Sequence, residues 1–144
     1  MIVRVAVIVG LVAVSGCTTI GMPGTKTDTA GTAGAGNGRV AATIINAMGG
    51  GLVGGAIGEG LSERDRRSAL EAEYRALEYT QGGRPVGWKS DRSGRSGEVV
   101  ASQPYRVGSQ DCRQYTHTIF TSSQSRSARG TACRNPDGSW TPLT

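Results

Sequence analysis

Two cysteines near the C-terminus constrain this chain most, because they indicate how two of its segments pair. Cys112 and Cys133 lie in two runs with a strand-like period of two, and they are symmetric about the bond between Ser122 and Ser123. A two-residue turn there would place the cysteines opposite each other in a non-hydrogen-bonded antiparallel pair, about 4.5 Å apart and within disulfide range. The same register pairs Arg113 with Ala132, Tyr115 with Gly130 and His117 with Ala128. We therefore predict a hairpin closed by a disulfide, which contributes roughly 3 kcal/mol of stability.

The first sixteen residues have the three parts of an export signal. Arg4 precedes an uncharged apolar run, Val5–Val14, and the small residues Ser15 and Gly16 precede Cys17. The run is too short to span a bilayer as an ordinary helix, which needs about 20 apolar residues. The VSGC motif resembles the lipobox of bacterial lipoprotein precursors, in which the cysteine receives diacylglycerol. We therefore expect residues 1–16 to be removed and Cys17 to carry lipid; an ordinary signal peptide is the alternative.

The cysteine count agrees with export. The chain has three cysteines, and an odd number in an exported protein needs an explanation. Lipid on Cys17 leaves Cys112 and Cys133 as an even pair in an oxidising compartment. Thr18 follows Cys17, where Asp would favour inner-membrane retention by resemblance to the sorting rule of enteric bacteria. We therefore predict a lipid anchor in the outer membrane, on the periplasmic face or the cell surface.

Two glycine-rich segments connect the anchor to the rest of the chain. Residues 17–39 are mainly Thr, Gly and Ala, which predicts a flexible tether. In the glycine-rich segment 40–61, which carries no charge from Val40 to Gly58, a glycine recurs every fourth position at Gly50, Gly54 and Gly58. On a helix these glycines would share one face and let another backbone approach closely. Because each glycine costs roughly 1 kcal/mol in a helix, we predict a glycine-zipper helix that needs a membrane or a second copy; a disordered loop is the alternative.

Residues 62–144 have the pattern of a small α+β domain. Ser62 is a candidate N-cap for a helix from Glu63 to about Tyr79, whose apolar stripe is formed by Leu70, Tyr74 and Leu77. The period then changes to two, and the predicted strands are Pro85–Lys89, Glu98–Ala101, Cys112–Phe120, Arg126–Cys133 and Ser139–Leu143. We therefore predict one helix packed on an antiparallel sheet of four to five strands.

The net charge of +5 arises in the C-terminal part of the chain, where nine basic residues follow residue 83 against four acidic ones. Such a domain favours anionic partners, and in an exported protein these are envelope polymers or lipids and not nucleic acid. The candidates for polyanion binding are Arg84, Lys89 and Arg92. Trp88, Tyr105 and Trp140 would complete such a face. Alternatively, the tryptophans belong to the core and the charges keep the domain soluble.

No arrangement of residues indicates catalysis. His117 is the only histidine, and on a strand it faces away from Cys112, so we expect it to be hydrogen-bonded at the edge of the core. Glu98 with Asp111 or Asp137 would imitate the carboxylate pair of a glycosidase, but such carboxylates are more often solvated or cap turns. We therefore predict no catalytic residue, no metal ligand and no cofactor.

Several motifs carry a family resemblance. They are Leu61–Arg66, Ala76–Tyr79, Trp88, Gly97–Val100, Cys112–Thr116, Gly130–Arg134 and Asp137–Trp140. With the lipobox and the glycine-rich segment ahead of them, they resemble the bacterial surface-antigen lipoproteins of the 17 kDa type. The resemblance covers nearly the whole mature chain, although Ser122-Ser123 stands where Asp-Gly is usual at the turn. It implies an outer membrane lipoprotein and supplies no reaction.

The sequence therefore indicates an outer-membrane-anchored lipoprotein with a structural or interaction role in the cell envelope, and not an enzyme. The alternative is a binding module whose basic face recognises lipopolysaccharide, peptidoglycan or an acidic protein. Its partners would be the membrane, through the N-terminal lipid, and a second copy, through the glycine segment. The expected divisions of the chain are 1–16, 17–39, 40–61 and 62–144.

Overall fold

The long helix α2 (Glu63–Glu78) begins where its cap residue predicts. The Ser62 hydroxyl accepts a hydrogen bond from the Asp65 amide at 3.1 Å, which satisfies one of the free donors of the first turn. The predicted apolar stripe of Leu70, Tyr74 and Leu77 is buried. Glu73, which the charged outer face would be expected to hold, is buried as well. The inward face of α2 is therefore wider and more polar than its apolar stripe predicts.

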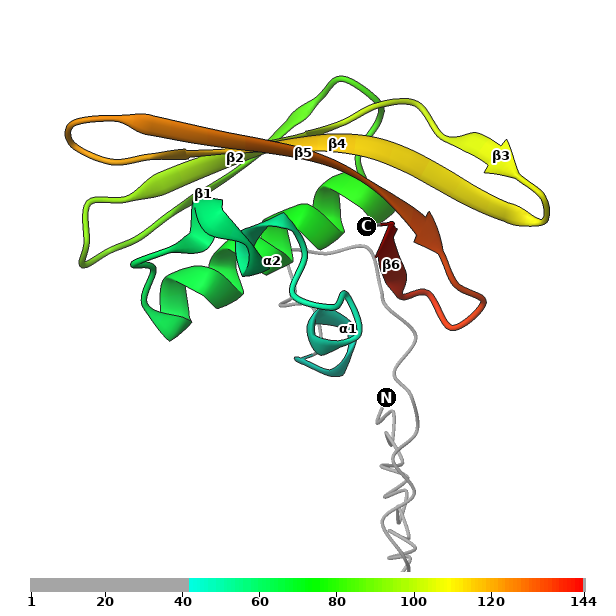
Figure 1. Cartoon of the computed structure of the whole chain (residues 1–144), viewed down its shortest axis with the longest axis horizontal. Coiled ribbons are helices and arrows are strands. Elements are labelled where there is room, and N and C mark those ends of the chain that lie inside the picture. The colour runs from blue at the N-terminus through cyan, green and yellow to red at the C-terminus, as the bar shows by residue number, and fades with distance from the viewer. Residues whose placement is uncertain (1–41, 144) are drawn as a thin grey trace, which may run out of the picture. The chain divides into compact units, whose positions relative to one another are not determined.

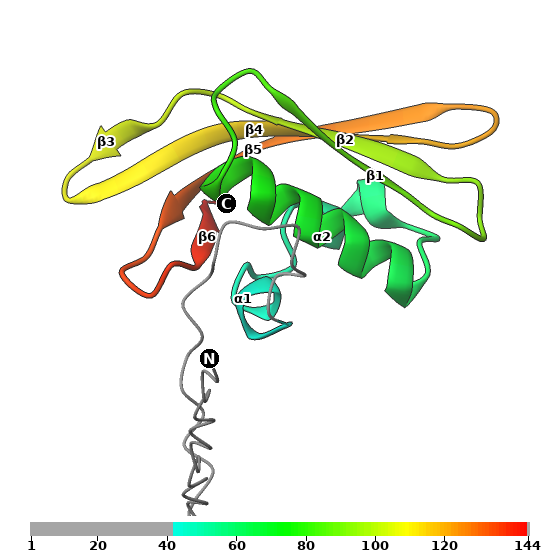
Figure 2. The same ribbon diagram turned by 180° about the vertical axis from the view of Figure 1, so that it is seen from behind.

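A computed structural model describes residues 42–143 and shows α2 packed against one face of a six-stranded antiparallel sheet (Figures 1 and 2). The strands are β1 (Pro85–Lys89), β2 (Ser96–Ala101), β3 (Tyr105–Val107), β4 (Gln110–Phe120), β5 (Ser125–Arg134) and β6 (Trp140–Leu143). Their order is β1-β2-β4-β5-β6, with β3 pairing with β4. The predicted α+β class is confirmed.

The register of the central hairpin is the one that the cysteines predict. β4 and β5 pair Cys112 with Cys133, and the two form a disulfide with their Cα atoms 4.0 Å apart. Thr121 N donates to Gln124 O at 2.9 Å, which closes the two-residue turn. The predicted pairs further along the hairpin are also present: Arg113 with Ala132, Tyr115 with Gly130 and His117 with Ala128.

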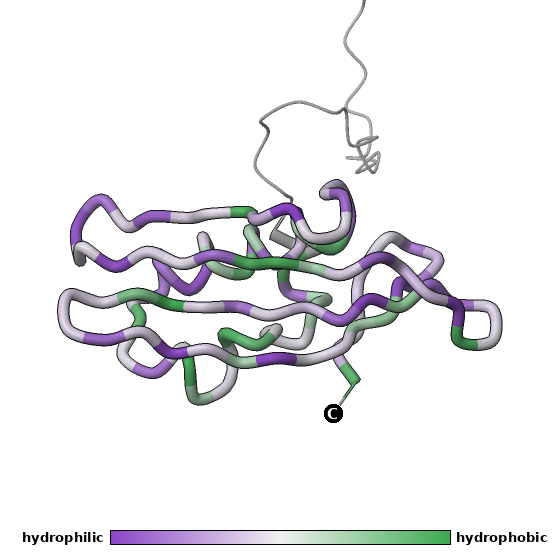
Figure 3. The backbone as a smooth tube through the Cα atoms, turned by 90° about the horizontal axis from the view of Figure 1, so that it is seen from above, coloured by the Kyte–Doolittle hydropathy of each residue, from purple (hydrophilic) through white to green (hydrophobic). Residues whose placement is uncertain are grey.

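The sheet has two unlike faces. Tyr115, His117 and Ile119 alternate along β4 toward α2 and are buried, as period-two burial requires. The face seen in Figure 3 is the one turned away from α2, and on β4 and β5 it carries polar side chains such as Thr118 and Ser127, whose hydroxyls are 2.7 Å apart. Strand β3, which sequence patterning does not predict, is three residues long. All three of its residues are exposed, so it lacks the alternation that marks a strand.

The glycine-rich segment does not form the predicted continuous helix. It contains a short helix α1 (Ala42–Asn46) and two 3-10 turns, η1 (Leu52–Gly54) and η2 (Ala56–Gly58). Gly49, Gly50 and Gly51 all have positive φ, which ends the helical conformation. Met48, Val53 and Ile57 are buried in the same core as α2 and the sheet. The segment is therefore part of the folded domain and not a separate element.

The three glycines of the proposed zipper do not share a helical face. Gly50 adopts a positive φ, and a Cβ at Gly54 would meet nothing within 4 Å. Gly58 is the one that close packing requires, because a Cβ there would lie 1.8 Å from Val53 O. Within residues 42–143, no helix is long and apolar enough to cross a bilayer. The predicted signal peptide, the predicted lipid on Cys17 and the predicted tether all fall within residues 1–41, which lie outside the described residues.

Candidate functional site

The single histidine is enclosed in the core by two partners. His117 Nδ1 lies 2.7 Å from Glu73 Oε1, and Trp88 Nε1 donates to His117 Nε2 at 2.9 Å. Because an indole nitrogen is a donor only, Nε2 must accept, so Nδ1 carries the proton and donates it to the carboxylate. His117 and Glu73 are both 0% exposed. His117 therefore lies in the interior of the core. The prediction that it lies at the edge of the core is wrong.

Glu73 also holds the glycine-rich segment in place. Its two carboxylate oxygens accept hydrogen bonds from Leu52 N at 3.0 Å and Val53 N at 3.1 Å. A Cβ on Gly51 would lie 2.0 Å from Glu73 Oε2, so only glycine lets the backbone approach this closely. We call Glu73, His117 and Trp88 the Glu73 cluster. Its hydrogen-bonding groups are engaged and buried, so its role is structural.

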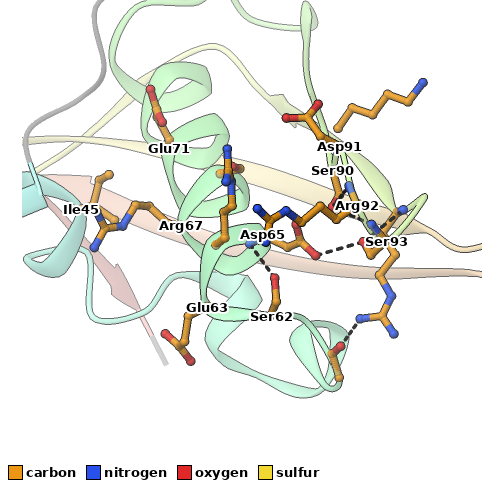
Figure 4. Close-up of a pocket in the computed structure, with 15 residues that line it drawn as sticks. Ile45, Ser62, Glu63, Asp65, Arg67, Glu71, Ser90, Asp91, Arg92 and Ser93 are labelled. Carbon is orange, nitrogen blue, oxygen red and sulfur yellow. Dashed lines mark hydrogen bonds between the residues drawn. The ribbon is translucent and has the colours of Figure 1, made fainter.

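A second group of polar residues is open to solvent. A cleft with a volume of about 1320 Å³ lies between α2 and the loop that joins β1 to β2 (Figure 4). Its exposed cations are Arg64 and Arg67 on α2 and Lys89 and Arg92 at the β1–β2 loop. We call these four residues and the space between them the basic cleft.

A buried carboxylate fixes the two walls of the basic cleft relative to each other. Asp65 on α2 is only 5% exposed and accepts a hydrogen bond from Ser93 Oγ in the loop at 3.0 Å, so it lies between Ser62 and Ser93 (Figure 4). Burial alone would raise the pKa of Asp65, but hydrogen bonds from Ser90, Ser93 and Ser62 hold it below its ordinary value. Asp65 is therefore charged at neutral pH and ties the loop to the helix.

The four cations of the basic cleft are left without ionic partners. Within the described part of the chain, none of their side chains forms an ion pair or a hydrogen bond that would neutralise it. Two of the four carboxylates that line the cleft are engaged elsewhere: Asp65 with Ser93, and Glu71 with Arg75 at 2.6 Å. Glu63 and Asp91 remain exposed at the cleft. The lining therefore has a small positive excess, with five cations, including the half-buried Arg95, against four carboxylates, and its exposed cations come from two elements.

The structure divides the predicted polyanion-binding residues. Lys89 and Arg92 line the basic cleft, whereas Arg84 precedes β1 at its other end, roughly 16 Å along an extended strand. Arg64 and Arg67 line the basic cleft in place of Arg84, although they were not among the predicted binding residues. Their spacing of three residues on a helix places them on one face, and this signal was available in the sequence.

The aromatic residues do not form a binding face. Trp88 and Trp140 are 8% and 2% exposed and belong to the core, while Tyr105 is exposed on β3. Trp140 Nε1 donates to Glu78 Oε2 at 2.8 Å, and Arg134 holds the same carboxylate. Burial would raise the pKa of Glu78, but these two donors lower it below its ordinary value. The alternative that the tryptophans are core residues is therefore correct.

The suggested glycosidase carboxylates do not converge either. Asp111 forms an ion pair with Arg106 at 3.5 Å, and Asp137 accepts from the Ser139 amide at 2.9 Å in a turn. Glu98 lies on β2 opposite Thr118. Among residues 42–143, no group of three or more potential ligands is placed to hold a metal ion.

A buried arginine closes the other end of α2. Arg113 Nη1 donates to the carbonyls of Ala76, Leu77 and Thr80 at 2.7–2.9 Å, and its Nε donates to Ser102 O. Two of these acceptors, the carbonyls of Ala76 and Leu77, belong to the last turn of the helix, where backbone carbonyls lack partners within the helix. Burial lowers the pKa of Arg113 from its ordinary value. Of the nine basic residues after residue 83, this one supports the fold and contributes nothing to a binding face.

Comparison with known proteins finds relatives of this chain. Residues 75–141 match the family of the 17 kDa outer membrane surface antigen. The chain is 39% identical over 108 residues to the 17 kDa surface antigen of Rickettsia bellii, covering 74% of the chain and 68% of that protein. It is 42% identical over 82 residues to the 17 kDa surface antigen of Rickettsia felis, covering 56% of the chain and 52% of that protein. No solved structure matches the chain.

Proposed function

We propose that this chain, which belongs to the 17 kDa outer membrane surface antigen family, is a lipid-anchored envelope protein that binds an anionic envelope component through its basic cleft. As a member of this family it is a membrane-associated protein of the outer membrane or cell surface. The lipid on Cys17 is supported by the VSGC motif after a short apolar run. A structural role in the envelope is supported by the folded domain, which the lipid on Cys17 would hold at the membrane.

One observation carries the binding role: four cations from two elements meet in one cleft and have no ionic partner among residues 42–143. Single exposed ion pairs contribute little, but several cations in one concave site raise the local concentration of an anionic ligand. The Asp65–Ser93 hydrogen bond preorganises the site, because it fixes the loop before any ligand arrives. A surface that only keeps the domain soluble would not need this buried connection.

We infer that the chain does not act as an enzyme. A general base must reach the proton that it removes, and the two ring nitrogens of His117 are occupied by Glu73 and Trp88. Cys112 is in a disulfide and has no thiol to act as a nucleophile. The Glu73 cluster resembles part of a catalytic triad in its residue types, but its burial supports a structural role.

Pull-down of the full mature chain with lipopolysaccharide and with peptidoglycan tests the binding role. The cleft variant combines Arg64→Gln, Arg67→Gln and Arg92→Gln. The control variant combines Arg84→Gln, Arg106→Gln and Arg129→Gln, which removes the same charge from exposed positions outside the cleft. We expect only the cleft variant to lose binding to one of the two polymers. Equal retention of all three proteins would contradict the proposed function.

Mass spectrometry of the mature protein tests the anchor. We expect a diacylglycerol-modified N-terminal cysteine, and we expect Cys17→Ser to release the protein from membranes washed with high salt. High salt screens contacts between exposed charges, so a Cys17→Ser protein that stays in the washed membrane fraction would contradict the lipid anchor.

A further inference from the structure

We propose that the basic cleft binds the phosphate groups of lipids in the same membrane that holds the N-terminal anchor. The domain would then lie against its own membrane, with α2 and the β1–β2 loop toward the lipid. This inference rests on the proposed function, since it names the anionic component that the cleft binds.

The N-terminal end of the described chain lies beside the basic cleft. The described chain begins with α1, and Ile45 of this short helix forms part of the cleft wall (Figure 4). Cys17 lies 25 residues before Ala42. Even a fully extended chain of that length reaches at most about 80–90 Å. A lipid on Cys17 would therefore keep the basic cleft close to the bilayer that holds the anchor.

The tether makes even weak lipid binding effective. Once the acyl chains are inserted, contact between the cleft and a headgroup is an intramolecular event, and its effective concentration is high because the linker is short. A polymer that is not attached to the same membrane has no such advantage. The position of Ile45 on the cleft wall thus favours lipid over peptidoglycan as the occupant.

The chemistry of the cations also favours phosphate groups. Three of the four are arginines, whose planar guanidinium groups donate in pairs to phosphate oxygens. Each cation near an anionic lipid surface raises the binding constant for that surface roughly fivefold. Three arginines together therefore account for about a 100-fold change in binding to anionic vesicles.

The tether itself is a poor occupant of the cleft. Between Thr18 and Ala41 it contains Lys26, Asp28 and Arg39, so its net charge is positive. A positive segment would be repelled by the unpaired cations of the cleft. Charge complementarity therefore requires a ligand from outside this chain.

Vesicle co-sedimentation tests this inference with the full mature chain. The chain carries Cys17→Ser, so that its own lipid does not drive binding. Vesicles of phosphatidylcholine with and without phosphatidylglycerol are compared at low and physiological salt. We expect salt-sensitive binding only to the vesicles that contain phosphatidylglycerol. The cleft variant should bind about 100-fold more weakly, and the control variant with the same charge should bind within a fewfold of the parent.

The other possible results separate the lipid inference from the proposed function. Cleft-dependent binding to peptidoglycan or to soluble dextran sulfate, with no binding to phosphatidylglycerol vesicles, would overturn the lipid inference and leave the proposed function standing. Absence of cleft-dependent binding to all of these probes would overturn both. Equal weakening of the cleft and control variants would show that net charge alone drives binding, and the cleft would not be a site.

Discussion

Helix α2 carries two polar regions on opposite faces, and they differ in how their charges are satisfied. On the inner face, Glu73 accepts hydrogen bonds from two backbone amides and from His117, whose other nitrogen is engaged by Trp88. On the outer face, Arg64 and Arg67 line a cleft and form no ion pair with any other residue that the structure describes. Buried polar groups must be paired because an unsatisfied one is costly, whereas water solvates exposed cations.

This difference explains why the residues that look most reactive are not the ones that we propose to bind a ligand. A histidine, a glutamate and a tryptophan within hydrogen-bonding distance form a chemically suggestive group, but all their capacity is used inside the protein. The unpaired cations of the basic cleft look ordinary in the sequence, yet they retain capacity for a ligand. If the Glu73 cluster and the basic cleft are independent, substitutions in the cluster should change stability and substitutions in the cleft should change binding.

His117→Ala should have the largest effect on stability. It removes a donor to Glu73, leaves Trp88 Nε1 without an acceptor and creates a cavity in the core. Breaking a buried pair in this way lowers the free energy of unfolding by about 3–5 kcal/mol. Urea denaturation measures the loss, and Thr118→Ala on the outer face of the sheet is the matched control, expected to cost less than about 1 kcal/mol. Similar values for both variants would mean that the Glu73 cluster is not a main support of the fold.

Gly51→Ala and Gly54→Ala should differ although they are neighbours in the same segment. A Cβ on Gly51 would lie 2.0 Å from Glu73 Oε2 at a φ of +57°, while a Cβ on Gly54 would meet nothing within 4 Å. We expect Gly51→Ala to lower the free energy of unfolding by about 2–3 kcal/mol. Gly54→Ala should be neutral or stabilising by up to about 1 kcal/mol. Thermal unfolding compares the two, and equal costs would contradict the contact with Glu73.

Asp65→Asn tests the connection between the two walls of the basic cleft, and its effect should depend on pH. The pKa of Asp65 in the folded protein is below its ordinary value of 3.8. Its contribution to stability is therefore complete above that value and is lost as pH falls through the folded pKa. We expect Asp65→Asn to cost about 1 kcal/mol at neutral pH and nothing in strong acid. A difference that is independent of pH would show that the charge of Asp65 is not involved.

The cleft variant should have the smallest effect on stability and the largest on binding. Arg64, Arg67 and Arg92 are exposed and unpaired within the described residues, so their replacement by Gln should change the free energy of unfolding by less than about 0.5 kcal/mol. Circular dichroism and urea titration check this directly. A large loss of stability would mean that the outer face of α2 is as structural as the inner face, and the comparison would fail.

Sequence reasoning succeeds where a local period or symmetry determines the structure. The parity of β4 and β5 and the symmetric cysteines fix the hairpin register, and Ser62 marks the start of α2. It fails at the glycine-rich segment, because a spacing of four residues does not distinguish a helical face from a turn with positive φ. Gly51 is required by Glu73, a residue twenty-two positions later, and such a contact is visible only in three dimensions.

The binding residues show the same limit. Lys89 and Arg92 belong to the cleft as predicted for a basic face, but linear proximity also suggests Arg84, which lies at the far end of β1. Arg64 and Arg67 join the cleft because α2 packs beside β1. Counting charges in the sequence therefore gives the sign of the proposed ligand, and only the packing of helix on sheet gives the location of the proposed site.

The disulfide spans the β4–β5 hairpin at the end opposite its exposed turn. A protease on the cell exterior that cuts between Ser122 and Ser123 would not release either half of the molecule. The two fragments would migrate together in a non-reducing gel and separate only after reduction. An antibody raised against the intact hairpin would thus continue to recognise the nicked protein until its sulfur bridge is reduced.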